Sequence, residues 1–120
     1  ESPTVLRLAE QYLIRAEARA RIGTNLTGAQ SDLNVIRDRA ETTASTSLNG
    51  PTLVTEIIEE LRKEFFCEQA HRWYTLKRIG QADVILGALK SSYVPEAKLL
   101  PFPNNAISAN PNLKQNPGYQ

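Results

Sequence analysis

Three prolines lie within the last eighteen residues of the chain, 103–120, and they constrain its fold more than any other feature. Pro103, Pro111 and Pro117 each lack a backbone N–H and push the preceding residue out of the helical region. Turn-forming residues occupy much of the remainder: Asn104, Asn105, Asn110, Asn112, Asn116 and Gly118. We therefore expect no helix in this stretch, although helical patterning dominates the rest of the chain.

Apolar residues recur along the same polar stretch. A disordered terminus is one interpretation, because chain ends are poorly ordered unless other contacts hold them. The apolar residues favour the other interpretation, in which residues 95–120 form an extended, irregular tail that packs on the helices. The expected anchors of this tail are Leu100, Phe102, Ile107, Leu113 and Tyr119.

Before the tail, apolar residues recur at spacings of three and four, which is typical of amphipathic helices. Thr4, Thr27 and Thr52 each precede such a pattern and are expected N-caps. The polar stretch 41–51 reads as a loop. The predicted helices are about 4–22, 27–40, 52–69, 71–80 and 82–89. We expect an all-α fold of antiparallel, tetratricopeptide-like hairpins in a helical region 1–94.

Length and charge narrow the classes of protein. A chain of 120 residues makes one domain, and its 14 basic and 13 acidic side chains nearly cancel. No basic surface therefore argues for a nucleic-acid partner. No apolar stretch approaches the length of a membrane span. The absence of methionine suggests a processed or excised piece of a longer protein.

Two carboxylates and an arginine follow one another at intervals of four residues. On a continuous helix, Glu64, Glu68 and Arg72 would share one face. Glu64 and Glu68 could serve as an acid and base pair only if their surroundings separated their pKa values. We favour a structural ion-pair face that ties neighbouring helices together.

His71 and Cys67 are the other candidates for chemistry. Glu68 and His71 have the spacing of half a carboxylate-bridged metal site, but His71 is the single histidine of the chain. No metal site and no cofactor is therefore expected. Cys67 and His71 could imitate a thiol and base couple, but no oxyanion site or orienting group accompanies them. We expect a buried, packed cysteine beside a capping histidine.

Trp73 and Tyr74 are the candidate ligand-binding residues. An aromatic ring can stack on the apolar face of a sugar, and the tyrosine hydroxyl adds a polar group. Both residues lie in the middle of an expected helix, between Arg72 and Leu76. Packing against neighbouring helices is the alternative, and we favour it.

Four segments, taken in order, resemble the SusD/RagB family: 8–18, 33–40, 60–78 and 100–119. The third contains a glutamate-rich and arginine-rich signature, and the fourth is similar to the family's terminal motif. Thr75 stands where the family often has aspartate, and Ile79 where it often has tryptophan. Residues 69–70 occupy a place usually held by one glycine.

The resemblance implies the C-terminal portion of a glycan-capturing lipoprotein of the bacterial outer membrane, which binds its ligand without catalysis. The implied partners are a SusC-like TonB-dependent transporter and an oligosaccharide or peptide ligand. The lipid anchor would lie outside this chain, so Cys67 does not match it. The family's ligand-contacting aromatics lie mostly upstream, so no ligand residue carries over. The alternative function is a tetratricopeptide-type scaffold for protein interaction.

Overall fold

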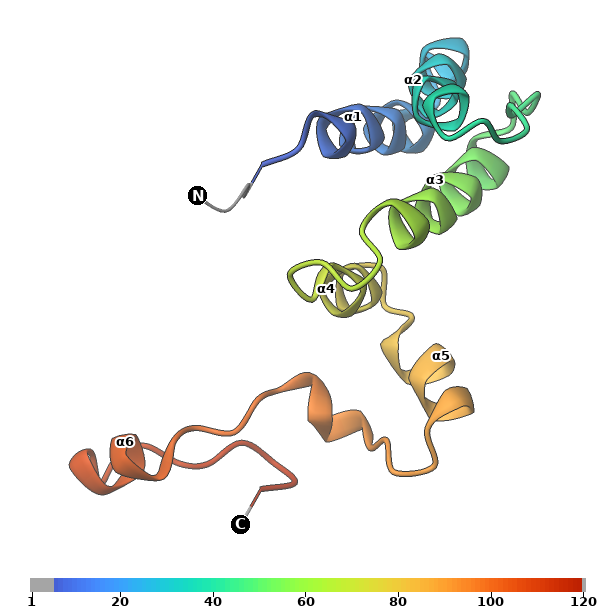
Figure 1. Ribbon diagram of the computed structural model, residues 1–120. Coiled ribbons are helices and arrows are strands. Elements are labelled where there is room, and N and C mark those ends of the chain that lie inside the picture. Colours follow the sequence, from blue (N-terminus) through green and yellow to red (C-terminus); the bar gives the residue numbers. More distant parts are fainter. Residues whose placement is uncertain (1–5, 120) are drawn as a thin grey trace. The chain divides into compact units, whose positions relative to one another are not determined.

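The structure is a computed structural model that describes residues 6–119. Within these residues the regular elements are all helical and no strand occurs (Figure 1), which confirms the predicted all-α class. The chain divides into two compact units, residues 1–72 and 73–120. The single domain expected from the sequence stays a prediction.

The first unit contains three helices, α1 (Leu8–Ile22), α2 (Leu26–Arg39) and α3 (Gly50–Glu64). The helix α1 contacts both α2 and α3, and α1 and α2 form the predicted hairpin (Figure 1). Burial of the shared apolar stripe is the main stabilising contribution to such helices. Its most deeply buried large side chains in this unit are Leu13, Leu33, Leu53 and Ile57.

Asparagines, and not the expected threonines, cap two of these helices. Asn25 Oδ1 accepts from Gly28 N at 2.9 Å, so α2 begins one residue earlier than predicted. Asn49 Oδ1 accepts from Thr52 N at 3.0 Å, and Pro51 occupies the first turn of α3, where no N–H is needed. The predicted cap Thr4 lies outside the described residues.

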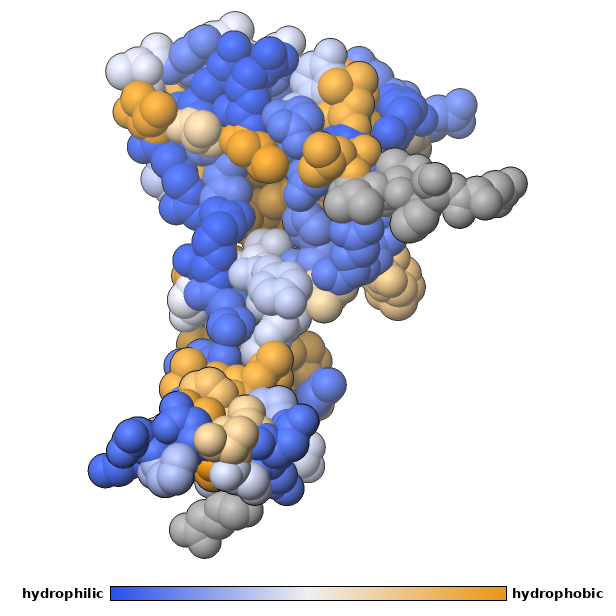
Figure 2. All heavy atoms as spheres, turned by 90° about the vertical axis from the view of Figure 1, so that its left-hand side faces the viewer, coloured by the Kyte–Doolittle hydropathy of each residue, from blue (hydrophilic) through white to orange (hydrophobic). Residues whose placement is uncertain are grey.

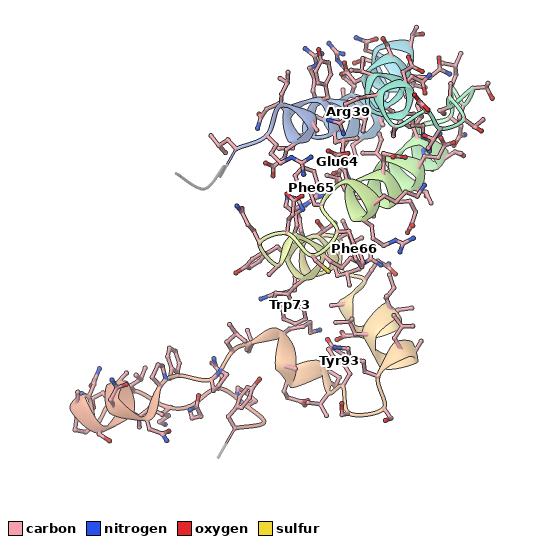
Figure 3. All side chains as sticks on the ribbon, in the orientation of Figure 1. Arg39, Glu64, Phe65, Phe66, Trp73 and Tyr93 are labelled. Atoms are coloured by element: carbon pink, nitrogen blue, oxygen red, sulfur yellow. The ribbon has the colours of Figure 1, made fainter. Side chains whose placement is uncertain are left out.

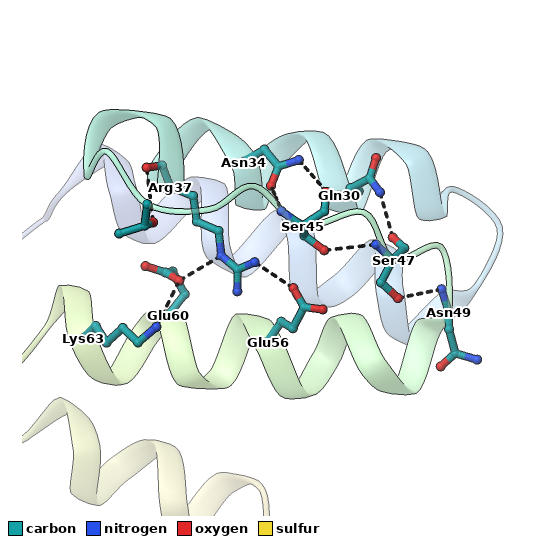
Figure 4. Close-up of polar contacts among 10 residues, drawn as sticks. Gln30, Asn34, Arg37, Ser45, Ser47, Asn49, Glu56, Glu60 and Lys63 are labelled. Carbon is teal, nitrogen blue, oxygen red and sulfur yellow. Dashed lines mark hydrogen bonds and ion pairs between the residues drawn. The ribbon is translucent and has the colours of Figure 1, made fainter.

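The loop between α2 and α3 runs along α2 and is held by amide side chains (Figure 4). Asn34 pairs with the backbone of Ser45 twice, through Nδ2 to the carbonyl at 3.0 Å and through Oδ1 from the N–H at 2.7 Å. Gln30 Nε2 donates to the carbonyl of Ser47 at 2.9 Å. The backbone of this irregular segment does not belong to a helix or a sheet, so these side-chain bonds satisfy its polar groups.

The third helix ends earlier than the sequence predicts. It stops at Glu64, whereas the apolar spacing predicts a helix to residue 69. Beyond the end of α3, positive φ values occur at Cys67 (59°), Gln69 (43°) and Ala70 (56°). Residues in this left-handed region cannot continue an α-helix. The following helix, α4 (His71–Arg78), is therefore a separate element.

In the second unit, α4 ends in a glycine turn. Gly80 has φ 69°, its N–H bonds Lys77 O at 3.2 Å, and Gln81 N bonds Leu76 O at 2.9 Å. This pair of bonds is a Schellman motif, so α4 ends two residues before the predicted limit. The helix α5 (Ala82–Leu89) has the predicted bounds.

The tail is less extended than predicted. A short 3-10 helix, η1 (Pro95–Lys98), and a six-residue helix, α6 (Asn104–Ala109), interrupt it (Figure 1). The expectation of no helix after residue 103 is wrong because residues 104–109 contain no proline. Pro103 immediately precedes α6, where its fixed φ and missing N–H do no harm.

Two amide side chains fold the tail on itself. Gln115 Oε1 accepts from Phe102 N at 2.8 Å, while its Nε2 donates to Phe102 O at 3.0 Å. Asn116 Nδ2 donates to Leu100 O at 2.7 Å. We call Leu100, Phe102, Gln115 and Asn116 the amide clasp.

None of the five predicted anchors is buried. Leu100 is 67% exposed and Phe102 38% exposed, while Ile107, Leu113 and Tyr119 are half-buried. Apart from the ion pair of Lys98 with Asp83 of α5, the bonds described for the tail join parts of the tail to one another. Packing of the tail on the helical region stays a prediction.

Candidate functional site

Side chains from α2, from α3 and from the residue before α1 meet at the C-terminal end of α3, where Figure 3 labels Glu64, Phe65 and Arg39. The side chain of Glu64 is 9% exposed and accepts hydrogen bonds from two guanidinium groups. One is Arg7 Nη2, from the residue that precedes α1. The other is Arg39 Nη2, from the last residue of α2, at 2.5 Å. A carboxylate buried to this degree needs such partners.

Arg7 contacts the segment after α3 as well. Its Nη1 donates to both carboxylate oxygens of Glu68, at 2.7 and 2.8 Å, and to the backbone carbonyl of Glu64 at 3.1 Å. Its guanidinium carbon lies 4.9 Å from the centre of the Phe65 ring, a cation–π distance. Arg7 therefore contacts the carboxylate and carbonyl of Glu64, the ring of Phe65 and the carboxylate of Glu68.

A second contact from α1 reaches the start of α4. Glu10 Oε1 lies 2.9 Å from His71 Nε2, and both side chains are largely buried. The His71 ring stacks on Phe65, with centroids 4.4 Å apart and planes inclined by 18°. We call Arg7, Glu10, Glu64, Phe65, Glu68 and His71 the junction cluster.

The three predicted ion-pair residues do not share one helical face. Glu64 and Glu68 both bind Arg7, but they do so from the end of α3 and from the turn beyond it, not from one helical face. Arg72 lies half-buried in the first turn of α4. No local pattern identifies Arg7 as their partner, because 57 residues separate it from Glu64.

Cys67 differs from its expected setting. It is exposed, with a positive φ, whereas we expect a packed thiol from its place in an apolar helical run. The end of α3 at Glu64 explains the difference, because the apolar face of the helix does not extend to residue 67. His71 caps no helix end through its ring, which instead contacts Glu10.

Other polar side chains of the first unit form ion pairs between helices. Arg37 of α2 reaches Glu56 at 2.8 Å and Glu60 at 3.1 Å on α3 (Figure 4). Asp32 of α2 accepts from Arg15 and Arg19 of α1. The hydrogen bond with Asp32, and then its charge, raise the pKa of Arg15 above the ordinary value. These carboxylates serve to join helices.

In the second unit, the candidate aromatic residues lie on α4, where Trp73 is labelled in Figure 3. Lys77 Nζ lies 5.4 Å from the centre of the half-buried Trp73 ring. Tyr74 is 62% exposed. Of the two, Tyr74 presents the more accessible ring for stacking.

Asp83 of α5 holds the polypeptide that follows it. It accepts from Tyr93 Oη at 2.9 Å and also binds Lys98 Nζ. The hydrogen bonds from Lys98 and then from Tyr93 lower the pKa of Asp83. Burial, and then the bond to Asp83, raise the pKa of Tyr93. This trio fixes α5 against η1.

Shallow hollows lie on the described residues of the first unit. One of about 360 Å³ follows the outer face of α1, between Leu8 and Arg15. Its aromatic member, Tyr12, already has the Arg15 guanidinium 5.3 Å from its ring centre.

Apolar atoms reach the surface in the view of Figure 2, but no described helix combines the length and apolarity that a bilayer span requires. No cluster of potential metal ligands occurs among residues 6–119.

Comparison with known proteins identifies the class to which this helical fold belongs. A model described as the SusD family matches residues 1–119. The chain therefore belongs to the SusD family.

Two relatives illustrate this relationship. The chain is 33% identical to the starch-binding protein SusD of Bacteroides thetaiotaomicron over 127 aligned positions, which cover 97% of the chain and 21% of the relative. It is similar to the crystal structure of a SusD-like protein from Bacteroides fragilis, with a TM-score of 0.76 and 28% identity over 95% of the chain. The chain spans 25% of that second protein, so it matches only a portion of each.

Proposed function

We propose that the chain is the C-terminal helical portion of a binding protein that captures oligosaccharide at the bacterial outer membrane. The observation that carries this proposal is the family match over residues 1–119. The 33% identical relative is named for binding starch, so starch-derived oligosaccharides are the first ligands to test.

Binding without catalysis is part of the proposal. The carboxylates that could form an acid and base pair, Glu64 and Glu68, both bind Arg7. A general acid or base must instead exchange its proton with a substrate within hydrogen-bond reach. The ion-paired carboxylates support a structural role, in which Glu64 and Glu68 join helices.

The ligand site is proposed to lie in the part of the protein beyond this chain. In the hollow on α1, the Arg15 guanidinium already lies over the Tyr12 ring, which supports a sugar site elsewhere. Trp73 and Tyr74 remain the candidate ligand residues within the chain. Tyr74 is the better of the two because of its exposure.

The proposed partner is a SusC-like TonB-dependent transporter, to which the protein would deliver its ligand. The proposed location is the cell surface, with a lipid anchor outside this chain. Family membership supports both proposals.

Binding assays of the full-length protein with a panel of oligosaccharides test this function. We expect saturable binding of at least one glycan, no shorter sugar products on chromatography, and co-purification of a TonB-dependent transporter from outer membranes. Cleavage of the bound sugar would contradict the non-catalytic role. Absence of binding to the whole panel would contradict glycan capture, and peptide capture would then be the ligand class to test.

A tetratricopeptide-type scaffold is the second candidate, and the antiparallel packing of α1 on α2 favours it. Such a scaffold would bind a protein partner without sugar. Glycan-independent retention of one protein other than a transporter in the same purification would favour it.

A further inference from the structure

The turn between α3 and α4 carries a concentrated backbone strain. Cys67, Gln69 and Ala70 all have φ between 43° and 59°, and none is glycine. Side chains with a Cβ rarely adopt this region, and such conformations persist only where surrounding contacts determine them.

Nothing in the local sequence requires this turn. Residues 65–70 contain no glycine or proline, and the helical pattern of α3 continues through them. Ala70 is the residue type with the highest helix propensity. Local preference alone would extend α3, so contacts from elsewhere hold the turn.

Arg7 supplies several of these contacts. It binds the carbonyl and carboxylate of Glu64 before the turn and both carboxylate oxygens of Glu68 within it. A continuous helix would carry Glu68 one turn further along the axis from Glu64, about 6 Å away. The geometry of one guanidinium suits the broken helix, in which it binds both carboxylates and the freed carbonyl.

Glu10 supplies the second contact, on the far side of the turn. It binds His71 Nε2 at 2.9 Å, and His71 stacks on Phe65. Within the turn, Glu68 N bonds Phe65 O at 3.1 Å and His71 N bonds Glu68 O at 2.8 Å. Both Arg7 and Glu10 belong to the start of α1, so one short segment holds both ends of the turn.

We propose that the start of α1 is a latch that holds residues 65–70 in a strained turn and thereby keeps α3 and α4 separate. Arg7 is the principal positioning residue of this latch. Release of Arg7 frees the turn to open more often and to leave its strained conformation. The latch is a conformational device additional to the proposed ligand capture.

Hydrogen exchange on the full-length protein tests the latch. In Arg7→Gln, the amides of Glu68 and His71 should exchange about tenfold faster or more, because the bonds of the turn open more often. Arg39→Gln is the matched control, since Arg39 also binds Glu64 but has no described bond to Glu68. In this control the same amides should change by less than about threefold.

An effect below tenfold in Arg7→Gln, or an equal effect in Arg39→Gln, would overturn the proposal.

A second variant tests the strain if Arg7→Gln fails to fold. Ala70→Gly should raise the melting temperature, because glycine adopts positive φ without steric cost. The control, Ala18→Gly at an exposed position of α1, should lower it. A lower melting temperature in Ala70→Gly would overturn the latch.

Discussion

Asp32 is one of the two most enclosed carboxylates among the described interhelical ion pairs, with 5% of its side chain exposed, as for Glu60. Arg15 donates to it at 2.7 and 2.9 Å, and Arg19 at 2.7 Å. The arginines are themselves 55% and 32% exposed, so solvent weakens the interaction. The enclosed acceptor still requires its donors, because an unpaired buried polar group is costly.

We expect Asp32→Asn to lower the free energy of unfolding by about 1–2 kcal/mol, since the amide keeps the shape but loses the charge. Urea denaturation measures this change. Asp38→Asn, at an exposed position of the same helix, should change it by less than about 0.5 kcal/mol. Equal effects of the two variants would contradict a specific role for Asp32.

Because the pKa of Asp83 is lowered in the folded state, the stability of the second unit should depend on pH. Lys98 and Tyr93 lower its pKa, so the carboxylate stabilises the folded state above the unfolded-state pKa. That stability is lost as the pH falls through the lowered folded-state pKa. Carbon-detected NMR should give a titration midpoint for Asp83 below the ordinary value of about 3.9. Lys98→Gln should raise the midpoint, and an unchanged midpoint would show that Lys98 does not act on Asp83.

At the scale of elements, the N-cap of α3 gives a test of a local interaction. Asn49 Oδ1 accepts from Thr52 N at 3.0 Å and from Thr52 Oγ1 at 2.9 Å. Asn49→Ala should lower the free energy of unfolding by about 1 kcal/mol, because a backbone donor of the first turn loses its partner. Asn49→Asp keeps an acceptor and should retain most of the stability. An equal loss in both variants would argue against capping as the cause.

The existence and order of the first five helices could be predicted from sequence, because apolar spacing records which face each helix buries. Their boundaries could not all be predicted. Threonine and asparagine both cap helices, and Asn25 and Asn49 each lie a few residues before the expected cap. Several residues near a helix start can accept the same bonds, so pattern alone does not choose among them.

The end of α3 and the helix α6 were missed for different reasons. Arg7 and Glu10 bind the turn after α3 although they lie far from it in the sequence. The local residue pattern therefore cannot predict where α3 ends. In the tail, the three prolines disfavour helix only at and next to their own positions. A helix of six residues fits between two of them, after Pro103 and before Pro111.

At the scale of the molecule, the candidate site was only partly readable from sequence. The spacing of Glu64 and Glu68 indicated an ion-pair role, and the structure gives both a shared partner, Arg7. That partner lies 57 and 61 residues away, so only the folded chain brings the residues together. Tyr74 was a candidate from its residue type alone, and its exposure is a property of the fold.

The tail gives a prediction for the whole molecule. Truncation of the full-length protein after Leu99 removes the amide clasp and the contact of Gly118 with Glu96, where an added Cβ would lie 2.8 Å from the glutamate Cβ. We expect a lower melting temperature in differential scanning calorimetry. Lys114→Ala, an exposed change within the tail, should leave melting nearly unchanged. Unchanged melting after truncation would reject a stabilising role for the tail.

Calorimetric titration with a starch-derived oligosaccharide should compare the full-length protein with this 120-residue chain. It tests whether the helices and tail belong to a glycan-binding protein whose ligand site lies beyond this chain. We predict saturable heat of binding for the full-length protein and none for the chain alone, with circular dichroism confirming that the isolated chain is helical. Equal affinity of the two would contradict the placement of the site.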